Sequence, residues 1–328
     1  MTASSIKLFL CRSSLNFANL PHLLPNTLCH IALQAPLGRT VFGKDRLLFI
    51  LIACIIPDLP WILLKGLLPL DCFDPYDLRL YCTAQASFLF CLVFSAALAA
   101  CCRQSGTIFV VLGSNCLFHL LLDGLEIKWG NGVHLVAPWS WTMMQFGLVW
   151  PEHPIILFSS LAGFLYLLYL LYSRQNERDC TMRPYLRGKA KTAAAVFFLF
   201  CYILAPLFFF EQMEKADTYN IHTLRMKDER PGKPLAFDRV HYFSQQQTLQ
   251  TFAGERIIIV GSQPASSGRV SFRGHFLTPT SFLSTQHHFH RDGRDFATFI
   301  GLFLTCTLLL QSLLLPHFQT GKNNQGPP

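Results

Sequence analysis

Long apolar segments recur through this sequence, and several have the length of a transmembrane helix. A helix needs about 20 apolar residues to cross the hydrocarbon core of a bilayer. Hydrophobic residues make up 51% of the chain and charged residues only 14%, which agrees with a polytopic membrane protein. We therefore predict a mainly α-helical protein with about six transmembrane helices, within segments 46–64, 85–102, 107–125, 154–172, 192–210 and 296–315.

A shorter apolar stretch, 24–41, precedes the first of these segments and contains His30. Pro36 and Gly38 interrupt it, and both residues disfavour a continuous helix. We therefore expect this stretch to be re-entrant or interfacial rather than a full crossing.

Basic residues indicate how the segments are oriented. Cytoplasmic connections carry an excess of Lys and Arg, and the connection after 154–172 has six basic side chains against two acidic ones. We place that connection in the cytoplasm, which puts the loop 126–153 and the long segment 212–295 on the exterior side. The formal net charge of +8 then reflects this topology and contact with anionic membrane lipids, and we expect no nucleic-acid partner.

The exterior segment 212–295 has a different pattern from the rest of the chain. Runs such as 256–260 and 269–273 are rich in β-branched residues or alternate with a period of two, and turn residues such as Gly254 and Gly268 flank them. We predict a small β-rich domain of the barrel or sandwich type between the fifth and sixth crossings, available to an unknown protein or substrate. The predicted organisation is a disordered leader (1–23), a helical membrane domain (24–211), the β-rich domain (212–295), the last transmembrane helix (296–316) and a disordered tail (317–328).

A run of three histidines lies near the end of the β-rich segment, at His287-His288-Phe289-His290. On a strand, side chains two residues apart share a face, so a metal ion could bridge His288 and His290. The alternative is a polar strand end close to the membrane.

Two ionisable residues, His119 and Asp123, interrupt the third apolar segment. Their spacing of four puts them on one face of a helix. A charged side chain at the bilayer centre costs roughly 2.5–3.5 kcal/mol on insertion scales, so such residues mark functional sites by default. A buried His–Asp pair that holds helices together is the structural alternative.

The loop 126–153 mixes aromatic and polar side chains, and His134 lies within it. Aromatic residues of this kind anchor membrane proteins at the interface, and they could also form the edge of a site. His134 is the residue of this loop that we expect to assist catalysis, by orienting a ligand or moving a proton near neutral pH.

Four motifs occur in a fixed order over residues 25–155, and together they resemble the YdjM-like family of inner-membrane-associated metal-dependent hydrolases. Members of that family carry an early His, a Pro-Asp-x-Asp, a two-histidine motif, and a His-x-x-x-Asp followed by a Gly-containing loop. The matching stretches here are Pro25-Asn-Thr-Leu-Cys-His30, Pro57-Asp58-Leu-Pro60, His119-Leu-Leu-Leu-Asp123 and Gly132-Val-His134-Leu-Val-Ala-Pro138.

The resemblance implies a site for one divalent metal ion, Zn²⁺ being the first candidate. Two imidazoles and two carboxylates suit zinc or another first-row ion. Pro60 replaces the second carboxylate of the family's Asp-x-Asp, and Gln85 lies in the stretch that replaces its two-histidine motif, so Gln85 would take part in catalysis together with His134. The metal ligands that the resemblance implies are His30, Asp58, His119 and Asp123.

Two classes of function follow from these patterns. The first is a metal-dependent hydrolase in the bacterial inner membrane, acting at the outer face on phosphoester or lipid-linked substrates, with 212–295 in the periplasm. The second is a non-enzymatic integral membrane protein whose exterior β-rich domain binds a partner. A transporter is a lesser third option, because no inverted repeat is visible in the sequence.

Overall fold

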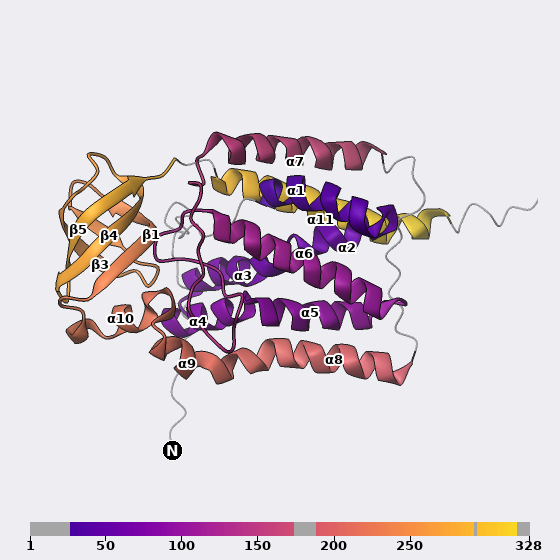
Figure 1. The fold of residues 1–328 in the computed structure, drawn as a ribbon, viewed down its shortest axis with the longest axis horizontal. Helices are drawn as coiled ribbons and strands as arrows, with labels where there is room; N and C mark the ends of the chain where they lie inside the picture. The colour runs from indigo at the N-terminus through magenta and orange to yellow at the C-terminus, as the bar shows by residue number, and fades with distance from the viewer. Residues whose placement is uncertain (1–26, 174–187, 292–293, 320–328) are drawn as a thin grey trace, which may run out of the picture.

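The computed structural model describes residues 27–173, 188–291 and 294–319. Within these residues the chain is mainly helical, and a small five-stranded barrel lies at one end of the helices (Figure 1). The predicted leader 1–23 and residues 320–328 of the predicted tail lie outside the described residues.

The long helices run roughly side by side in Figure 1, with short helical turns at their ends. The α-helices are α1 (Thr27–Phe42), α2 (Leu47–Ala53), α3 (Leu59–Leu67), α4 (Pro75–Gln85), α5 (Phe88–Ala100), α6 (Ser105–Leu125), α7 (Pro154–Ser173), α8 (Lys189–Leu204), α9 (Phe210–Lys215), α10 (Ile221–Arg225) and α11 (Arg294–Gln319). The 3₁₀ turns are η2 (Lys44–Arg46), η3 (Ile56–Asp58), η4 (Leu68–Leu70), η5 (Ala205–Phe209), η6 (Thr218–Asn220) and η7 (Lys227–Glu229).

Among the residues that the structure describes, four helical segments are long and apolar enough to cross a membrane. They are Lys44–Leu70, Ser105–Leu125, Pro154–Ser173 and Lys189–Lys215, and each contains one of the predicted segments. The predicted segment 85–102 corresponds to α5, which is bent by 66° from α4, and the two helices together make a fifth candidate span.

The sixth predicted segment, 296–315, lies within α11, whose apolar part Phe296–Ser312 is shorter than the others.

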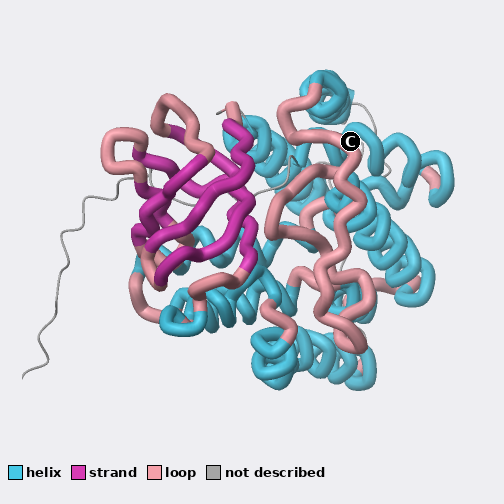
Figure 2. The backbone as a smooth tube through the Cα atoms, turned by 60° about the vertical axis from the view of Figure 1, so that its left-hand side comes forward, coloured by secondary structure: helices cyan, strands magenta, loops and turns pink. Residues whose placement is uncertain are grey.

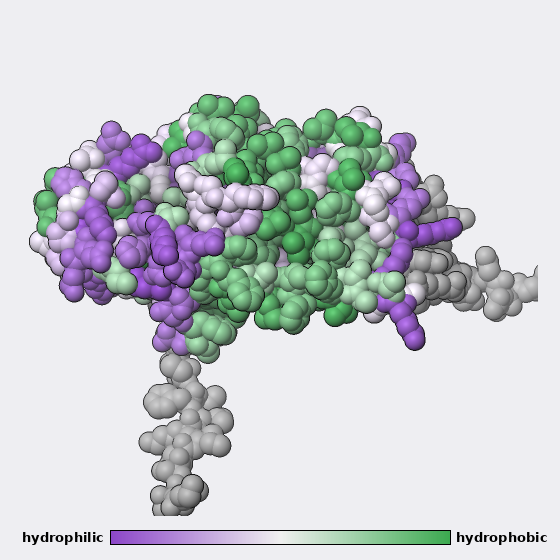
Figure 3. Space-filling model, turned by 60° about the horizontal axis from the view of Figure 1, so that its bottom comes forward, coloured by the Kyte–Doolittle hydropathy of each residue, from purple (hydrophilic) through white to green (hydrophobic). Residues whose placement is uncertain are grey.

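The side-chain surface agrees with a membrane location for the helices. Figure 3 shows hydrophobic residues over the middle of the helical part and hydrophilic residues at its two ends, one of which carries the barrel. A contiguous apolar surface of this kind, here called the apolar belt, marks contact with a membrane or a protein.

Helix α1 corrects the expectation that Pro36 and Gly38 would interrupt the first apolar stretch. Pro36 lies inside a continuous helix, Thr27–Phe42. Packing compensates for the lost backbone hydrogen bond, because Ile31 and Ala35 are fully buried among side chains of α2, α6, α7 and α11. Gly38 contributes by its small size, since a Cβ there would meet the Ile50 side chain at 2.8 Å.

The barrel confirms the predicted small β-rich domain and identifies it as a closed barrel. Its strand order is β1-β2-β3-β5-β4, with β3 and β5 parallel and the other pairs antiparallel. Alternating residues such as Phe237, Ile257 and Phe272 fill the interior. The strands are β1 (Pro234–Phe243), β2 (Thr248–Gln250), β3 (Arg256–Gly261), β4 (Gly268–Thr278) and β5 (Ser281–Phe289).

Residues 212–233 were predicted to belong to the β-rich domain, but they form helical turns that lead from the membrane helices into the barrel. Three residues here, Asp217, Tyr219 and Asn220, have positive φ angles of 46°, 55° and 59°. This left-handed conformation is uncommon for residues other than glycine, and it turns the chain too sharply for a strand. The first strand therefore begins at Pro234.

The loop 126–153 lies between the helices and the barrel and joins them. Its Trp129 ring lies 4.5 Å from the guanidinium carbon of Arg273 on β4, and Asn131 donates a hydrogen bond of 3.1 Å to Asp238 on β1. In Figure 2 long loop segments lie beside the strands and across the ends of the helices. The barrel is thus docked on the helical part through this loop.

Candidate metal centre

The four residues that the family resemblance implied as metal ligands come together in the interior of the helical part. His119 and Asp123 lie on one face of α6, His30 lies on α1, and Asp58 ends η3. His119 is fully buried and Asp58 is 1% exposed. Nε2 of His119 lies 3.4 Å from Oδ1 of Asp58 and 3.5 Å from Oδ2 of Asp123, and Nε2 of His30 lies 3.6 Å from Oδ1 of Asp123.

Local sequence explains how Asp58 reaches this cluster. Pro57 and Pro60 flank it, and proline cannot donate the backbone hydrogen bond that a continuous helix needs. The span Lys44–Leu70 is accordingly broken into α2, η3 and α3, with Asp58 at the break. A residue at such a break can turn its carboxylate toward a neighbouring helix, here α6.

Helix α1 is held close to α7, and this contact places His30. Gly163 on α7 lies directly against α1, since a Cβ at that position would be 2.0 Å from the backbone oxygen of Leu28. The imidazole rings of His30 and His119 stack with a centroid separation of 3.9 Å and an angle of 3°. Both rings thus present Nε2 to the same carboxylate.

The polar atoms of this cluster are poorly satisfied by the protein itself. Among the described residues, neither carboxylate oxygen of Asp58 has a hydrogen-bond partner, and the same holds for both ring nitrogens of His119 and for Nδ1 of His30. A buried polar group without a partner costs about 1–3 kcal/mol. Two imidazoles and the Asp58 carboxylate with unsatisfied atoms, together with Asp123 beside them, are a ligand set that fits a first-row divalent cation such as Zn²⁺.

Lys128 is a further member that the sequence analysis did not connect to the cluster. Its ammonium lies 2.8 Å from Oδ1 of Asp123 and 3.3 Å from Oε2 of Glu126, and all three side chains are buried. Asp123 therefore joins the two histidines on one side to Lys128 on the other. Lys128 comes from the loop just after α6, and no sequence pattern indicated that the loop folds back over the helix end.

His134, predicted to assist catalysis, lies next to the cluster. It lines a small cavity together with Asp123 and Lys128 and is 3% exposed. Its ring is 5.8 Å from that of Trp141 and 5.6 Å from that of Tyr219. Burial lowers the pKa of His134 to about 4, so the imidazole is neutral at neutral pH, which fits an orienting role better than proton transfer near pH 7.

Gln85 is placed differently from the metal-ligand candidates. Its amide donates hydrogen bonds of 3.1 Å to the hydroxyl of Tyr81 and 3.2 Å to the backbone oxygen of Tyr202 on α8. These bonds direct the amide to the α4–α8 contact. A catalytic role for Gln85 remains a prediction that rests on the family resemblance.

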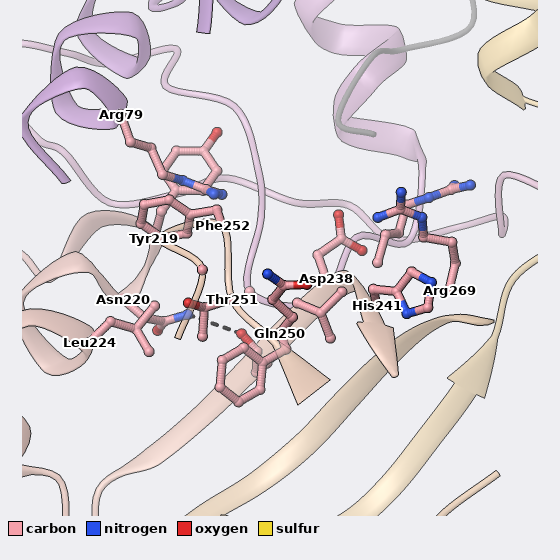
Figure 4. Close-up of a pocket in the computed structure, with 16 residues that line it drawn as sticks. Arg79, Tyr219, Asn220, Leu224, Asp238, His241, Gln250, Thr251, Phe252 and Arg269 are labelled. Carbon is pink, nitrogen blue, oxygen red and sulfur yellow. Dashed lines mark hydrogen bonds between the residues drawn. The ribbon is translucent and has the colours of Figure 1, made fainter. Parts of the chain in front are cut away.

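A second pocket lies on the barrel side of the cluster and is shown in Figure 4. Arg79 of α4 lies at one end, with its guanidinium carbon 4.3 Å from the ring centroid of Phe252 and 5.1 Å from that of Tyr219. Arg239 and Arg269 line the pocket from β1 and β4. Three arginines face two carboxylates, since Asp238 lines the pocket and Glu152 lies 3.7 Å from the Arg239 guanidinium, so the excess positive charge suits an anion.

Tyr219 lines both cavities, the one beside Asp123 and the one with the arginines. Its hydroxyl donates a 2.7 Å hydrogen bond to the backbone oxygen of Gly132. The two cavities are therefore neighbours, separated by this ring and the turn at 130–132.

No protein-family model matches this chain, and comparisons with curated proteins and with solved structures find no match either. The resemblance to the YdjM-like family therefore rests on the four sequence motifs.

Proposed function

We propose that this chain is a membrane-embedded, metal-dependent hydrolase of the YdjM-like type. The observation that supports the proposal is the convergence of His30, Asp58, His119 and Asp123 from three separate elements onto one buried cluster. Divalent ions bound by such side chains polarise an ester and acidify a bound water.

The residues around the cluster have separate tasks under this proposal. Lys128 holds one oxygen of Asp123 and so fixes the orientation of that carboxylate. His134, neutral and buried in the adjoining cavity, accepts or donates a hydrogen bond to a substrate or water there. Trp61 and Val133 line the same cavity with apolar surface, which limits the access of bulk water.

The neighbouring pocket points to an anionic substrate group. Arg79, Arg239 and Arg269 supply positive charge, and guanidinium groups bind phosphate oxygens well. Because Tyr219 lines both cavities, a phosphate held among the arginines would lie next to the metal cluster. A phosphoester, carried on a lipid or free, fits this arrangement.

The membrane placement completes the proposal. The chain crosses a bacterial inner membrane six times, with the bent pair α4–α5 as the second crossing and α11 as the sixth. The barrel and the loop 126–153 lie on the periplasmic side, so the cluster opens toward the outer face. Membrane lipids surround the apolar belt in Figure 3.

One observation favours the non-enzymatic alternative. The ammonium of Lys128 already contacts Asp123 at 2.8 Å, so the cluster can be a buried ion network that joins α1, α6 and the loop. The barrel also exposes apolar side chains, Ile258 and Val260 of β3 and Leu277 of β4, that a partner protein could cover.

Metal content of the detergent-purified full chain separates these functions. The native protein, H119A and the control H222A, whose partly exposed histidine lies far from the cluster in sequence, are compared after dialysis. The hydrolase proposal requires that the native protein and H222A bind metal and that H119A binds less. It also requires that the native protein hydrolyses a phosphodiester, such as a dispersed phospholipid, and that H119A loses this activity. Unchanged metal content in H119A excludes the proposal.

A further inference from the structure

A second cluster of potential ligands lies away from the helical site, where the barrel meets the end of loop 126–153. Glu152 of that loop and His290 after β5 are hydrogen bonded, with Nδ1 of His290 2.7 Å from Oε1 of Glu152. His288 lies beside them, with its Nε2 3.5 Å from Oε2 of the same glutamate. One ligand atom from each of the three residues lies within 4.8 Å of the others.

Strand geometry places these two histidines together and excludes the third. His288 and His290 share a face because they are two residues apart, whereas His287 points away and contacts the hydroxyl of Ser262 at 2.8 Å. Trp150 stacks on His288 with a centroid separation of 3.6 Å and an angle of 8°. The stacking fixes the ring with Nε2 toward Glu152.

Two atoms at the centre of the cluster have no partner of their own. Oε2 of Glu152 and Nε2 of His288 are buried, and neither has a hydrogen-bond partner among the described residues. Their separation of 3.5 Å is too long for a good hydrogen bond. Two ligands of one tetrahedral zinc, with bonds of about 2.0–2.2 Å, lie roughly 3.3–3.6 Å apart, a range that includes this separation.

The second ring nitrogen of His290, Nε2, has a hydrogen-bond partner, as is usual for an imidazole that binds a metal through its other nitrogen. Its Nε2 lies 2.8 Å from Oγ of Ser271, and that hydroxyl lies 3.1 Å from Oδ1 of Asp238. If Nδ1 binds an ion, then Nε2–H donates to Ser271 and the hydroxyl donates to Asp238. Each group in this chain then has a partner, and such outer hydrogen bonds orient histidine ligands.

A β-bulge in β1 builds this support. The register of β1 against β4 shifts between Phe237 and Val240, and Arg239 at the bulge has a φ angle of 51°. The backbone N–H of Arg239 donates to Ser271 at 3.0 Å, and its guanidinium lies 3.7 Å from Oε1 of Glu152. Bulges redirect side chains in this way, and Oε2 of Glu152 stays directed at His288.

The surroundings of Glu152 suit a carboxylate ligand. Its Oε1 lies 2.7 Å from Nδ1 of His290 and 3.7 Å from the guanidinium of Arg239. Arg239 accounts for part of the balancing positive charge, so geometry rather than charge alone must distinguish a metal site from an ion network.

We propose that Glu152, His288 and His290 form a second metal site, which takes a divalent first-row cation with Zn²⁺ as the best-fitting member. Two imidazoles and one carboxylate are a common protein ligand set for zinc and leave a fourth position for water. The site joins the barrel to the loop that leads directly into α7. A bound ion there fixes how the barrel lies against the helices.

The test is a Zn²⁺ and Co²⁺ titration of the chelator-stripped full chain in detergent. E152Q preserves the shape of the side chain, and H288F preserves the ring that stacks on Trp150. H287F, on the other face of the strand, is the matched control, and H119A reports the helical site separately.

We expect E152Q and H288F each to lose one equivalent of bound metal, while H287F keeps it. The Co²⁺ visible absorption of this site should vanish in the same two variants, and H119A should retain it. Circular dichroism and gel filtration check folding of each variant. Metal stoichiometry and Co²⁺ spectrum unchanged in both E152Q and H288F would overturn the proposal, whatever H119A shows for the helical site.

Discussion

Asp58 and His119 approach to 3.4 Å in the interior of the helical part, although they lie on different spans and no hydrogen bond closes the gap. A single carboxylate against a single imidazole would normally settle at hydrogen-bond distance in a dry interior. The open spacing lies beside three potential ligand atoms, from His30, His119 and Asp123, that are all within 4.8 Å of one another.

The first prediction concerns Asp58 itself. D58N keeps the size of the side chain and replaces a charged ligand by a neutral amide, so we expect metal affinity to fall by about tenfold or more, equivalent to at least about 1.4 kcal/mol. Competition against a chromogenic chelator measures the change. D45N, at an exposed aspartate in η2, is the control and should bind like the native protein.

The second prediction concerns Lys128, the cation that already contacts the cluster. K128M removes the positive charge between Asp123 and Glu126 and leaves two buried carboxylates without it. Breaking a buried ion pair typically costs about 3–5 kcal/mol. We expect a lower melting temperature without metal and a larger rise on adding Zn²⁺ than the native protein shows. Equal Zn²⁺-induced rises in the two proteins would argue for a purely structural network.

A third prediction concerns the acid stability of the barrel. Arg230 is fully buried and makes hydrogen bonds of 2.9 and 2.6 Å to the two oxygens of Glu255. Burial raises the pKa of Glu255, but Arg230 and Lys227 outweigh burial and lower it. A carboxylate whose pKa is lower in the folded state than in the unfolded state stabilises the fold at pH values above its unfolded-state pKa. This stabilisation is lost as the pH falls through the folded-state pKa.

Barrel stability should accordingly decline once the pH falls below about 4.5, the ordinary value for a glutamate. E255Q should lose most of this pH dependence and be less stable at pH 7 by about 3 kcal/mol, because Arg230 would keep a buried charge without its carboxylate. Urea unfolding at pH 7 and pH 4, followed by near-ultraviolet circular dichroism, gives both quantities. The same stability loss between pH 7 and 4 in both proteins would contradict the assignment.

The fourth prediction tests the contact that positions His30. G163A puts a methyl group where only 2.0 Å separates it from the backbone oxygen of Leu28, so α1 and α7 must move apart. Overpacking of this kind costs about 1–3 kcal/mol, and metal affinity should fall because His30 moves with α1.

G106A is the matched control for that variant. It lies in α6 with no atom within 4 Å of the added methyl group, and alanine favours a helix over glycine by about 1 kcal/mol. A rise or no change in melting temperature is expected for G106A. If G163A behaved like G106A, the close α1–α7 contact would not hold His30 in place.

The fold was predictable where the pattern is local. Apolar length located four candidate spans, and the β-branched run 256–260 located a strand of the barrel. The pairing of α4 with α5 across the bend was missed, because α4 carries Asp77 and Arg79 and the apolar run begins only at α5. The continuous α1 was missed because tertiary packing around Ile31 and Ala35 outweighs the proline at position 36.

The residues of the candidate site also differ in how far the sequence alone predicts them. His119 and Asp123 follow from helical spacing alone, and His30 and Asp58 could be added only through the family resemblance. The contact between Glu152 and His290 joins residues that are 138 positions apart. No periodicity in one sequence encodes such a pairing, since it depends on how the barrel docks.

Tyr219, held in a left-handed turn, is the common wall of the arginine pocket and of the cavity beside Asp123. A ligand that fills both cavities must pass this one ring, whose hydroxyl is tied to Gly132. The boundary between the two cavities is thus a phenol that belongs to neither group of charges.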